Sequence, residues 1–157
     1  MKLSTRSRYG LRAMVDLADL RSADLRAMAA PPVPLSALAG KQGISEAYLE
    51  QLLRALKRAG LVTASRGVNG GYRLARPPET ISVEDILRAL EGRTSVADCV
   101  SGEGVACESA CTCAARPLFL KLQARITGVL ESTTLYDLAT EHQEQKDRMH
   151  HAKKRLS

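Results

Sequence analysis

The four cysteines of the chain all lie in one short segment, DCVSGEGVACESACTC, from Asp98 to Cys113. Thiolates are soft ligands for zinc and iron–sulfur clusters, and exposed thiols of low pKa react with oxidants. Two glycines, Gly102 and Gly104, give the backbone freedom to wrap around a bound group. The thiols follow a C-x7-C-x3-C-x-C spacing, which lacks the two C-x2–4-C pairs typical of structural zinc sites. Iron–sulfur, zinc, redox-switch and inert roles all remain open for Cys99, Cys107, Cys111 and Cys113.

The start of the chain, MKLSTRSRYG, lacks the apolar core of a signal peptide, and no apolar run reaches the length of a membrane span. We therefore expect a cytoplasmic protein in a reducing compartment and no membrane partner. Clustered thiols there bind metals or do redox work more often than they form structural disulfides. His142, His150 and His151 are interpreted as solvated surface histidines.

Charge is distributed unevenly over the 157 residues. Residues 1–78 carry 13 Lys and Arg against 5 Asp and Glu, whereas residues 79–157 carry 10 against 12. A cationic half indicates a module that binds a polyanion. The chain has no Trp, four Tyr and one Phe, so it offers few aromatic faces on which single strands could stack. Double-stranded DNA is the expected partner.

The cationic half has the pattern of a helix-turn-helix. Apolar spacing predicts helices over residues 5–28, 35–41 and 45–58, with Gly43 in the turn and Ser45 as a cap. The third helix has a core stripe of leucines. Its opposite face presents five residues spaced along the helix: Ala47, Glu50, Gln51, Arg54 and Arg58. Two helices across a glycine turn, the second with a polar outer face, fit helix-turn-helix.

A β-hairpin is predicted directly after these helices, in GLVTASRGVNGGYRLA, around a two-residue Asn69–Gly70 turn. A helix-turn-helix followed by a small hairpin is a winged helix. Arg66 and Arg73 flank the turn, where they could reach phosphates or a minor groove. Arg8 and Arg12 of the first helix could add contacts to the DNA backbone. Residues 1–78 are therefore expected to be a winged helix-turn-helix DNA-binding domain.

The remaining chain is expected to follow the DNA-binding domain with a linking segment and to join two copies of the protein. In residues 79–113 a short helix begins at Ser82, with a capping box formed with Asp85, and the cysteine-rich loop follows. Residues 114–145 hold a long helix to about residue 132, with a narrow apolar stripe, and a further helix restarted by Thr134. The stripe could pack internally or against its copy in a homodimer. Residues 146–157 are predicted to form a polar, frayed tail. The fold class is mostly α, with a β-hairpin wing and a long dimerisation helix.

Four stretches together closely resemble the IscR-like winged-helix regulators of the Rrf2 family: MKLSTRSRYGLRAMVDLA, VPLSALAGKQGISEAYLEQLLRALKRAGLV, SRGVNGGYRL and CTCAARPLFLKL. The resemblance runs from Met1 to about Ala139. It implies a homodimeric transcription factor whose long helix, around 116–132, builds the dimer. It also implies that cysteines just before that helix hold an iron–sulfur cluster that tunes the choice of DNA.

The resemblance assigns roles to individual residues. Glu50 and Gln51 fall at base-reading positions and Arg66 at the wing arginine, while Ala47 replaces a serine of some relatives. The cluster ligands implied are Cys99, Cys107 and Cys113, because Cys107-x5-Cys113-x5-Phe119 has the family's intervals. Cys111 is an extra thiol and a candidate fourth ligand, since Arg116 stands where some relatives have a ligand histidine. A [2Fe–2S] cluster is expected in preference to [4Fe–4S].

The sequence therefore predicts a dimeric regulator of cluster-assembly or iron and redox genes that senses an iron–sulfur cluster or redox status. Arg54 and Arg58 would hold phosphates. One alternative is a regulator of the same family that has no cluster, or that senses nitric oxide. Another is a thiol or iron–sulfur redox protein. An enzyme is not expected, because the sequence shows no nucleotide-binding glycine motif, no nucleophile–base pair and no His/Glu metal dyad.

Overall fold

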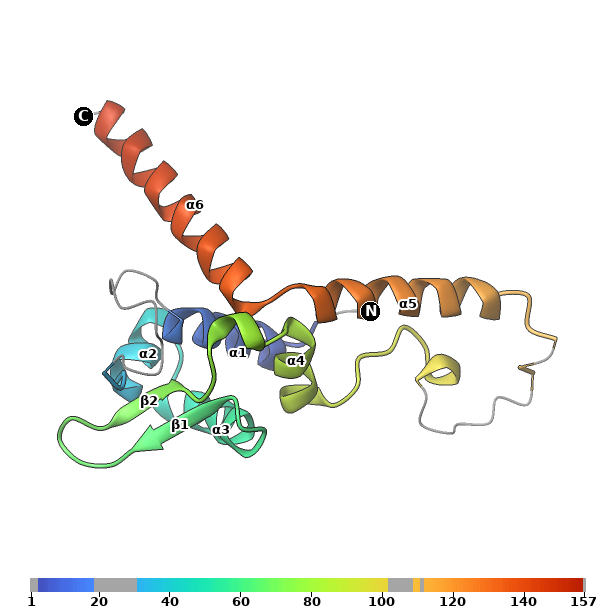
Figure 1. Ribbon diagram of the computed structural model, residues 1–157, viewed down its shortest axis with the longest axis horizontal. Helices are drawn as coiled ribbons and strands as arrows, with labels where there is room; N and C mark the ends of the chain where they lie inside the picture. Colours follow the sequence, from blue (N-terminus) through green and yellow to red (C-terminus); the bar gives the residue numbers. More distant parts are fainter. Residues whose placement is uncertain (1–2, 19–30, 102–108, 111, 157) are drawn as a thin grey trace.

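The computed structural model describes residues 3–18, 31–101, 109–110 and 112–156 (Figure 1). The winged-helix elements come first, and two longer helices follow them (Figure 1). In chain order the elements are α1 (Thr5–Leu17), α2 (Leu35–Gln42), α3 (Glu46–Arg58), β1 (Val62–Ser65), β2 (Gly71–Leu74), η1 (Pro78–Thr80), α4 (Val83–Glu91), η2 (Asp98–Val100), α5 (Arg116–Ser132) and α6 (Leu135–Leu156). In the described residues no helix is both long and apolar enough to cross a membrane.

Helix α1 packs through Ala13 and Met14, which are fully buried in the core. Ser4 caps its start, because its hydroxyl oxygen accepts from the Ser7 amide at 3.2 Å. The helix ends at Leu17, so the prediction of one helix over residues 5–28 was wrong about where it stops. The Ala18 amide donates to the carbonyls of both Met14 and Val15, which closes the last turn. Residues 19–30 lie outside the described part of the chain.

The helix-turn-helix is confirmed at α2 and α3. Gly43 ends α2 with φ of +65°, a left-handed conformation that favours glycine, as a glycine C-cap requires. Ser45 caps α3 by accepting from the Tyr48 amide at 3.2 Å. The predicted leucine stripe of α3 lies in the core, where each side chain is at most 1% exposed: Leu49, Leu52, Leu53 and Leu56. The opposite face of α3 is thereby fixed toward solvent.

The wing is an antiparallel pair of β1 and β2 in which Val62 pairs with Leu74 and Ser65 with Gly71. This register leaves the five residues 66–70 as the loop, so the predicted two-residue Asn69–Gly70 turn is wrong. A two-residue type I′ turn needs positive φ at both central residues, and neither residue has it. Instead the Gly70 amide donates to the Gly67 carbonyl at 2.9 Å and closes a turn whose fourth residue is glycine.

A third backbone segment supports the wing. Val33 and Tyr72 exchange two backbone hydrogen bonds, of 2.8 and 2.9 Å, on the edge of β2 away from β1. This bridge fixes how the hairpin lies against the helices, because Val33 leads directly into α2.

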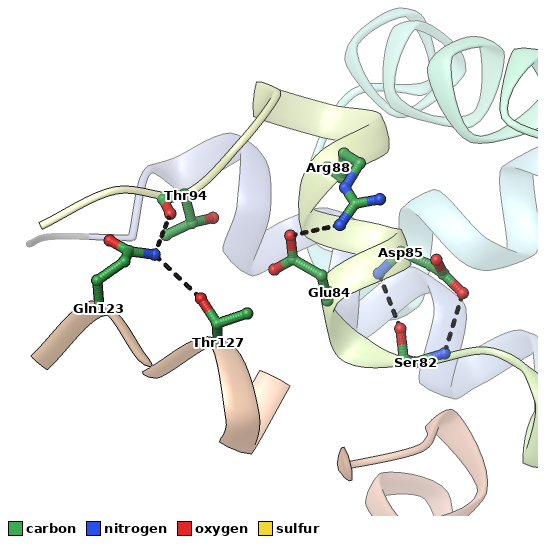
Figure 2. A network of polar contacts seen from close by, with 7 residues as sticks. All are labelled: Ser82, Glu84, Asp85, Arg88, Thr94, Gln123 and Thr127. Carbon is green, nitrogen blue, oxygen red and sulfur yellow. Dashed lines mark hydrogen bonds and ion pairs between the residues drawn. The ribbon is translucent and has the colours of Figure 1, made fainter. Parts of the chain in front are cut away.

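Helix α4 follows the wing and packs on α1 and α3. The predicted capping box at its start is confirmed: the Asp85 amide donates to Ser82 Oγ at 3.0 Å, and the Ser82 amide to Asp85 Oδ2 at 3.3 Å (Figure 2). The helix ends before Gly92, as predicted. Glu84, which is only 7% exposed, forms an ion pair with the more exposed Arg88 at 3.0 Å, one turn along the same helix (Figure 2).

Helices α5 and α6 extend away from the winged helix in different directions (Figure 1). Their junction is held to the core because the Leu135 amide donates to the Ile81 carbonyl and Leu135 is fully buried. The predicted restart at Thr134 is confirmed, since Thr134 Oγ1 accepts from the Asp137 amide at 3.1 Å. Helix α6 then continues to Leu156, so residues 146–156 are helical and not the frayed tail that we predicted. A side-chain hydrogen bond one turn apart, from Gln143 to Asp147 at 2.9 Å, supports this extension.

Candidate nucleic-acid interface and cysteine segment

The outer face of α3 carries the residues that the sequence assigned to DNA. Gln51, Arg54 and Arg58 are exposed, and Glu50 is half-buried. The Arg54 guanidinium lies 3.3 Å from a Glu50 carboxylate oxygen, with side chains 67% and 47% exposed. Exposed ion pairs of this kind contribute about 0–1 kcal/mol, so both groups are free to exchange partners. Ser45 uses its hydroxyl oxygen as the helix cap, which leaves its O–H as a donor.

The wing places its arginines on the solvent side. Arg66 is exposed at the first position of the loop, and Val68 near the tip is entirely exposed. Arg73 is also exposed, and its Nε donates to Thr63 Oγ1 across the hairpin at 3.3 Å. The hairpin therefore presents a cation on its strand and another in its loop.

Tyr72 joins the wing to the polar face of α3 and was not found from the sequence. Burial raises the pKa of its phenol above 10.0, the Glu50 carboxylate raises this pKa further, and Arg54 opposes both effects. These influences require the phenol to lie near Glu50 and Arg54. Tyr72 of the wing is therefore near enough to Glu50 and Arg54 of α3 for their charges to act on its phenol.

Arg8 and Arg12 each contact a neighbouring side chain of α1. Arg8 donates to Thr5 Oγ1 at 3.2 Å. The Arg12 guanidinium lies 5.6 Å from the centre of the Tyr9 ring, in cation–π geometry. Tyr9 in turn meets Tyr48 of α3 edge to face, with ring centres 6.2 Å apart. Arg12 is thereby connected to the first turn of α3.

The structure describes two of the four cysteines. Cys99 lies in η2 and Cys113 lies just before α5, and both are half-buried free thiols. Cys107 and Cys111 lie outside the described residues. Among the described residues alone, no group of three His, Cys, Asp or Glu side chains is placed to hold a metal ion.

Gln123 fastens the segment before Cys99 to α5. Its Oε1 accepts from the Val96 amide at 2.9 Å, and its Nε2 donates to the Thr94 carbonyl at 2.9 Å. The same Nε2 also donates to Thr127 Oγ1 at 3.0 Å, which fixes the amide on its own helix (Figure 2). Because the partners lie 27 and 29 residues earlier, no local sequence signal indicates this contact.

Arg116 stands beside Cys113 at the start of α5. Its backbone amide donates to the Cys113 carbonyl at 3.3 Å, and its Nε is buried without a hydrogen-bond partner in the described residues. A buried guanidinium donor without an acceptor favours an anion nearby. Thiolates or a thiolate-ligated cluster are anions of that kind, so Arg116 at the start of α5 is chemically compatible with the predicted group.

A model of the Rrf2 family, described as iron-dependent transcriptional regulator, matches residues 3–141. The chain is 39% identical to the HTH-type transcriptional regulator CymR of Bacillus subtilis over 140 residues, which are 89% of this chain and 91% of that protein. It is 36% identical to the HTH-type transcriptional regulator IscR of Aliivibrio salmonicida over 146 residues, 93% of this chain and 82% of the relative.

Two solved structures have the same winged-helix architecture. The structure of CymR, the global cysteine regulator of B. subtilis, superposes with a TM-score of 0.72 at 38% identity and covers 90% of this chain and 98% of that one. T. potens IscR superposes with a TM-score of 0.70 at 37% identity, over 92% and 90% of the two chains. The predicted fold class, a winged helix with additional long helices, is confirmed.

Proposed function

Because the chain belongs to the Rrf2 family of transcriptional regulators, we propose that it is a homodimer that reads duplex DNA and responds to an iron–sulfur cluster. The family, its resemblance to IscR and a role in transcription rather than catalysis follow from the relatives. The dimer, the residues that contact DNA and the cluster are the proposed parts. A cytoplasmic location belongs to the same proposal.

The exposure of α5 is the main support for the proposed homodimer. This helix of 17 residues buries none of them in one copy of the chain. Leu118, Leu122 and Val129 lie on one stripe and are 56%, 43% and 63% exposed. An apolar stripe of this kind marks an interaction surface. A second α5 would cover it, and a two-fold dimer would then place two α3 helices on two half-sites of an operator.

DNA reading follows from the face shared by α3 and the wing. The Glu50 carboxylate can accept from a cytosine amino group, and the Gln51 amide can pair with adenine in two hydrogen bonds. Arg54 and Arg58, with Arg8 and Arg12 of α1, would hold phosphates and give affinity without sequence preference. Arg66 and Arg73 would bind the DNA backbone beside the major groove. The Ser45 hydroxyl would donate to a phosphate.

The cysteine segment would hold the cluster through Cys99, Cys107 and Cys113, with Cys111 as the candidate fourth ligand. Iron–sulfur clusters require thiolates, and the Arg116 guanidinium would favour thiolates and offset negative charge. A [2Fe–2S] cluster is proposed in preference to [4Fe–4S]. When bound, the cluster supplies a group that oxidants or iron shortage can change or remove. The genes controlled would serve cluster assembly or iron and redox homeostasis.

The contacts of Gln123 and α4 connect the cysteine segment to the elements that are proposed to read DNA. Gln123 ties residues 94–96 to α5, and α4 joins this segment to α1 and α3 of the winged helix. A change at the cysteines would therefore shift α5, the proposed dimer helix, relative to the DNA-reading face. Such a coupling between sites is typically worth about 1–3 kcal/mol.

A second candidate is a regulator that has no cluster and responds through its thiols or a partner. The similarity to B. subtilis CymR, a cysteine regulator, favours it, because the identity is as high as that to IscR.

Purification without oxygen, followed by a visible spectrum and iron, sulfide and zinc analysis, separates the two candidates. The cluster proposal predicts brown protein with matching iron and sulfide, both lost in Cys107→Ala. Colourless protein without iron after reconstitution would contradict it and leave the thiol regulator.

A further inference from the structure

A cleft of about 530 Å³ lies where α6 leaves the winged helix. Its walls come from α1, α2 and α6, and Val15 and Leu138 provide an apolar part of the lining. Clefts of about 300–1,000 Å³ are typical of small-molecule sites. Its lining, among the described residues, includes no residue of α3 or of the cysteine segment, and it shares Arg12 with the proposed DNA contacts.

One wall of the cleft contains a buried polar pair. Gln42, at the end of α2, is only 7% exposed, and its Nε2 donates to an Asp16 carboxylate oxygen. The Gln42 Oε1 is buried and has no hydrogen-bond partner among the described residues. Burying an amide with an unpaired acceptor is costly, so such groups occur where another function needs them. The hydrogen bond from Gln42 holds the Asp16 carboxylate in the lining of the cleft.

The remaining charges have both signs. Arg12, Lys41 and Lys146 contribute cations, and Glu141 adds a second carboxylate to that of Asp16. A simple anion would be attracted by the cations but repelled by the two carboxylates. A simple cation would be attracted by the carboxylates but repelled by the cations. A small molecule that carries an ammonium and a carboxylate satisfies both sets.

The cleft is connected to the recognition helix by two routes. Gln42 directly precedes Gly43, which makes the turn into α3. Arg12, which lies on α1 one turn before Asp16, stacks on Tyr9, and Tyr9 meets Tyr48 in the first turn of α3. We propose that this cleft binds a small zwitterion of the α-amino-acid class, and that its occupation changes the affinity of the protein for DNA. The binding event is independent of the proposed cluster and is measurable without DNA.

Calorimetric titration of the full chain with each proteinogenic α-amino acid, at millimolar concentration and without DNA, tests the ligand class. At least one amino acid is expected to bind once per subunit. The corresponding amine without its carboxylate and the corresponding acid without its ammonium should each bind at least about tenfold more weakly, a loss of about 1.4 kcal/mol. No binding by any amino acid, or equal binding by the acid, would overturn the proposal.

Two substitutions test the location. Asp16→Asn removes a carboxylate, and Lys146→Gln removes a cation, each with little change of shape. Both should weaken binding at least about tenfold, whereas Lys154→Gln, on the same helix beyond the cleft, should bind as wild type. Circular dichroism melting establishes that each variant is folded. Undiminished binding by both folded cleft variants would place the ligand elsewhere and overturn the assignment.

Fluorescence anisotropy with a labelled duplex tests the link to DNA. The amino acid that binds should change the duplex affinity by about 5–150-fold in wild type, and by less in Asp16→Asn. An unchanged affinity at saturating ligand would refute the link. Duplex binding without ligand is measured in the same titration, so failure of the DNA-binding proposal would be recognised separately.

Discussion

Gln51 and Arg54 lie one turn apart on the exposed face of α3, and their chemistry predicts different defects. Gln51→Ala should cost about 1–3 kcal/mol on the preferred duplex and little on random DNA, because an amide that pairs with adenine reads sequence. Arg54→Ala should weaken both duplexes alike and reduce the salt slope by about 1, because a phosphate contact releases counterions. Anisotropy titrations over a range of salt measure both. Equal losses on both duplexes for both variants would refute the assigned roles.

Tyr72 reports whether the wing lies on α3. Its phenol should ionise at a higher pH than the other tyrosines, because burial and the Glu50 carboxylate both disfavour the phenolate. The unfolded chain then loses this proton first, so stability should begin to fall as the pH rises through 10.0 and stop falling above the folded pKa. An absorbance titration of wild type against Tyr72→Phe measures the shift, and Glu50→Gln should reduce it. A pKa of the Tyr72 phenol at or below 10.0 would contradict its position beside Glu50.

Local signals in the sequence predicted the caps but not the long-range contacts. Ser45 and the Ser82–Asp85 box act within one helical turn, so their residue types are enough to indicate them. Tyr72 lies near Glu50 and Arg54 of α3 in a strand that is also bridged to Val33 from outside the hairpin. Gln123 binds backbone 27 and 29 residues away, a distance at which side-chain type carries no information.

The wing depends on close approach of two backbones at Gly71. A Cβ placed there would lie 2.3 Å from the Val33 carbonyl oxygen, and a backbone atom in a paired bridge has little room to move. Gly71→Ala should therefore destabilise the fold by about 1–3 kcal/mol and weaken DNA binding. Urea denaturation measures the first effect and anisotropy the second.

Gly40→Ala is the matched control for this substitution. Gly40 is an exposed residue of α2, and a Cβ there meets nothing within 4 Å, so the change should be neutral or stabilising by up to about 1 kcal/mol. If Gly71→Ala is as stable as Gly40→Ala, the bridge to Val33 does not hold the wing.

At the level of elements, periodicity predicted where helices begin better than where they end. The leucine stripe of α3 and the restart at Thr134 combine an apolar pattern with a cap, and both are confirmed. The polar composition after residue 145 concealed a helix, because such a helix depends on contacts between successive turns and not on an apolar face. The Asn69–Gly70 pair indicated a hairpin correctly, but the register with Ser65 and Gly71 set a longer loop.

For the molecule as a whole, the proposed regulator requires two copies of the chain to meet through α5. Leu122→Lys with Val129→Lys would place two charges on the exposed stripe, so the variant should sediment as a monomer of 17.0 kDa while wild type sediments at twice that mass. Lys154→Gln on α6 is the control and should remain dimeric. A wild type that is monomeric at micromolar concentration, or a double variant that still dimerises, would exclude α5 as the dimer helix.

The state of the cysteine segment is proposed to control how α3 and the wing read DNA. The decisive measurement is the affinity, without oxygen, of cluster-loaded and cluster-free protein for a duplex selected from a random library. The two forms should differ by about 5–150-fold, and Cys107→Ala should behave as the cluster-free form. Equal affinities of the loaded and cluster-free protein for every selected duplex would contradict the account.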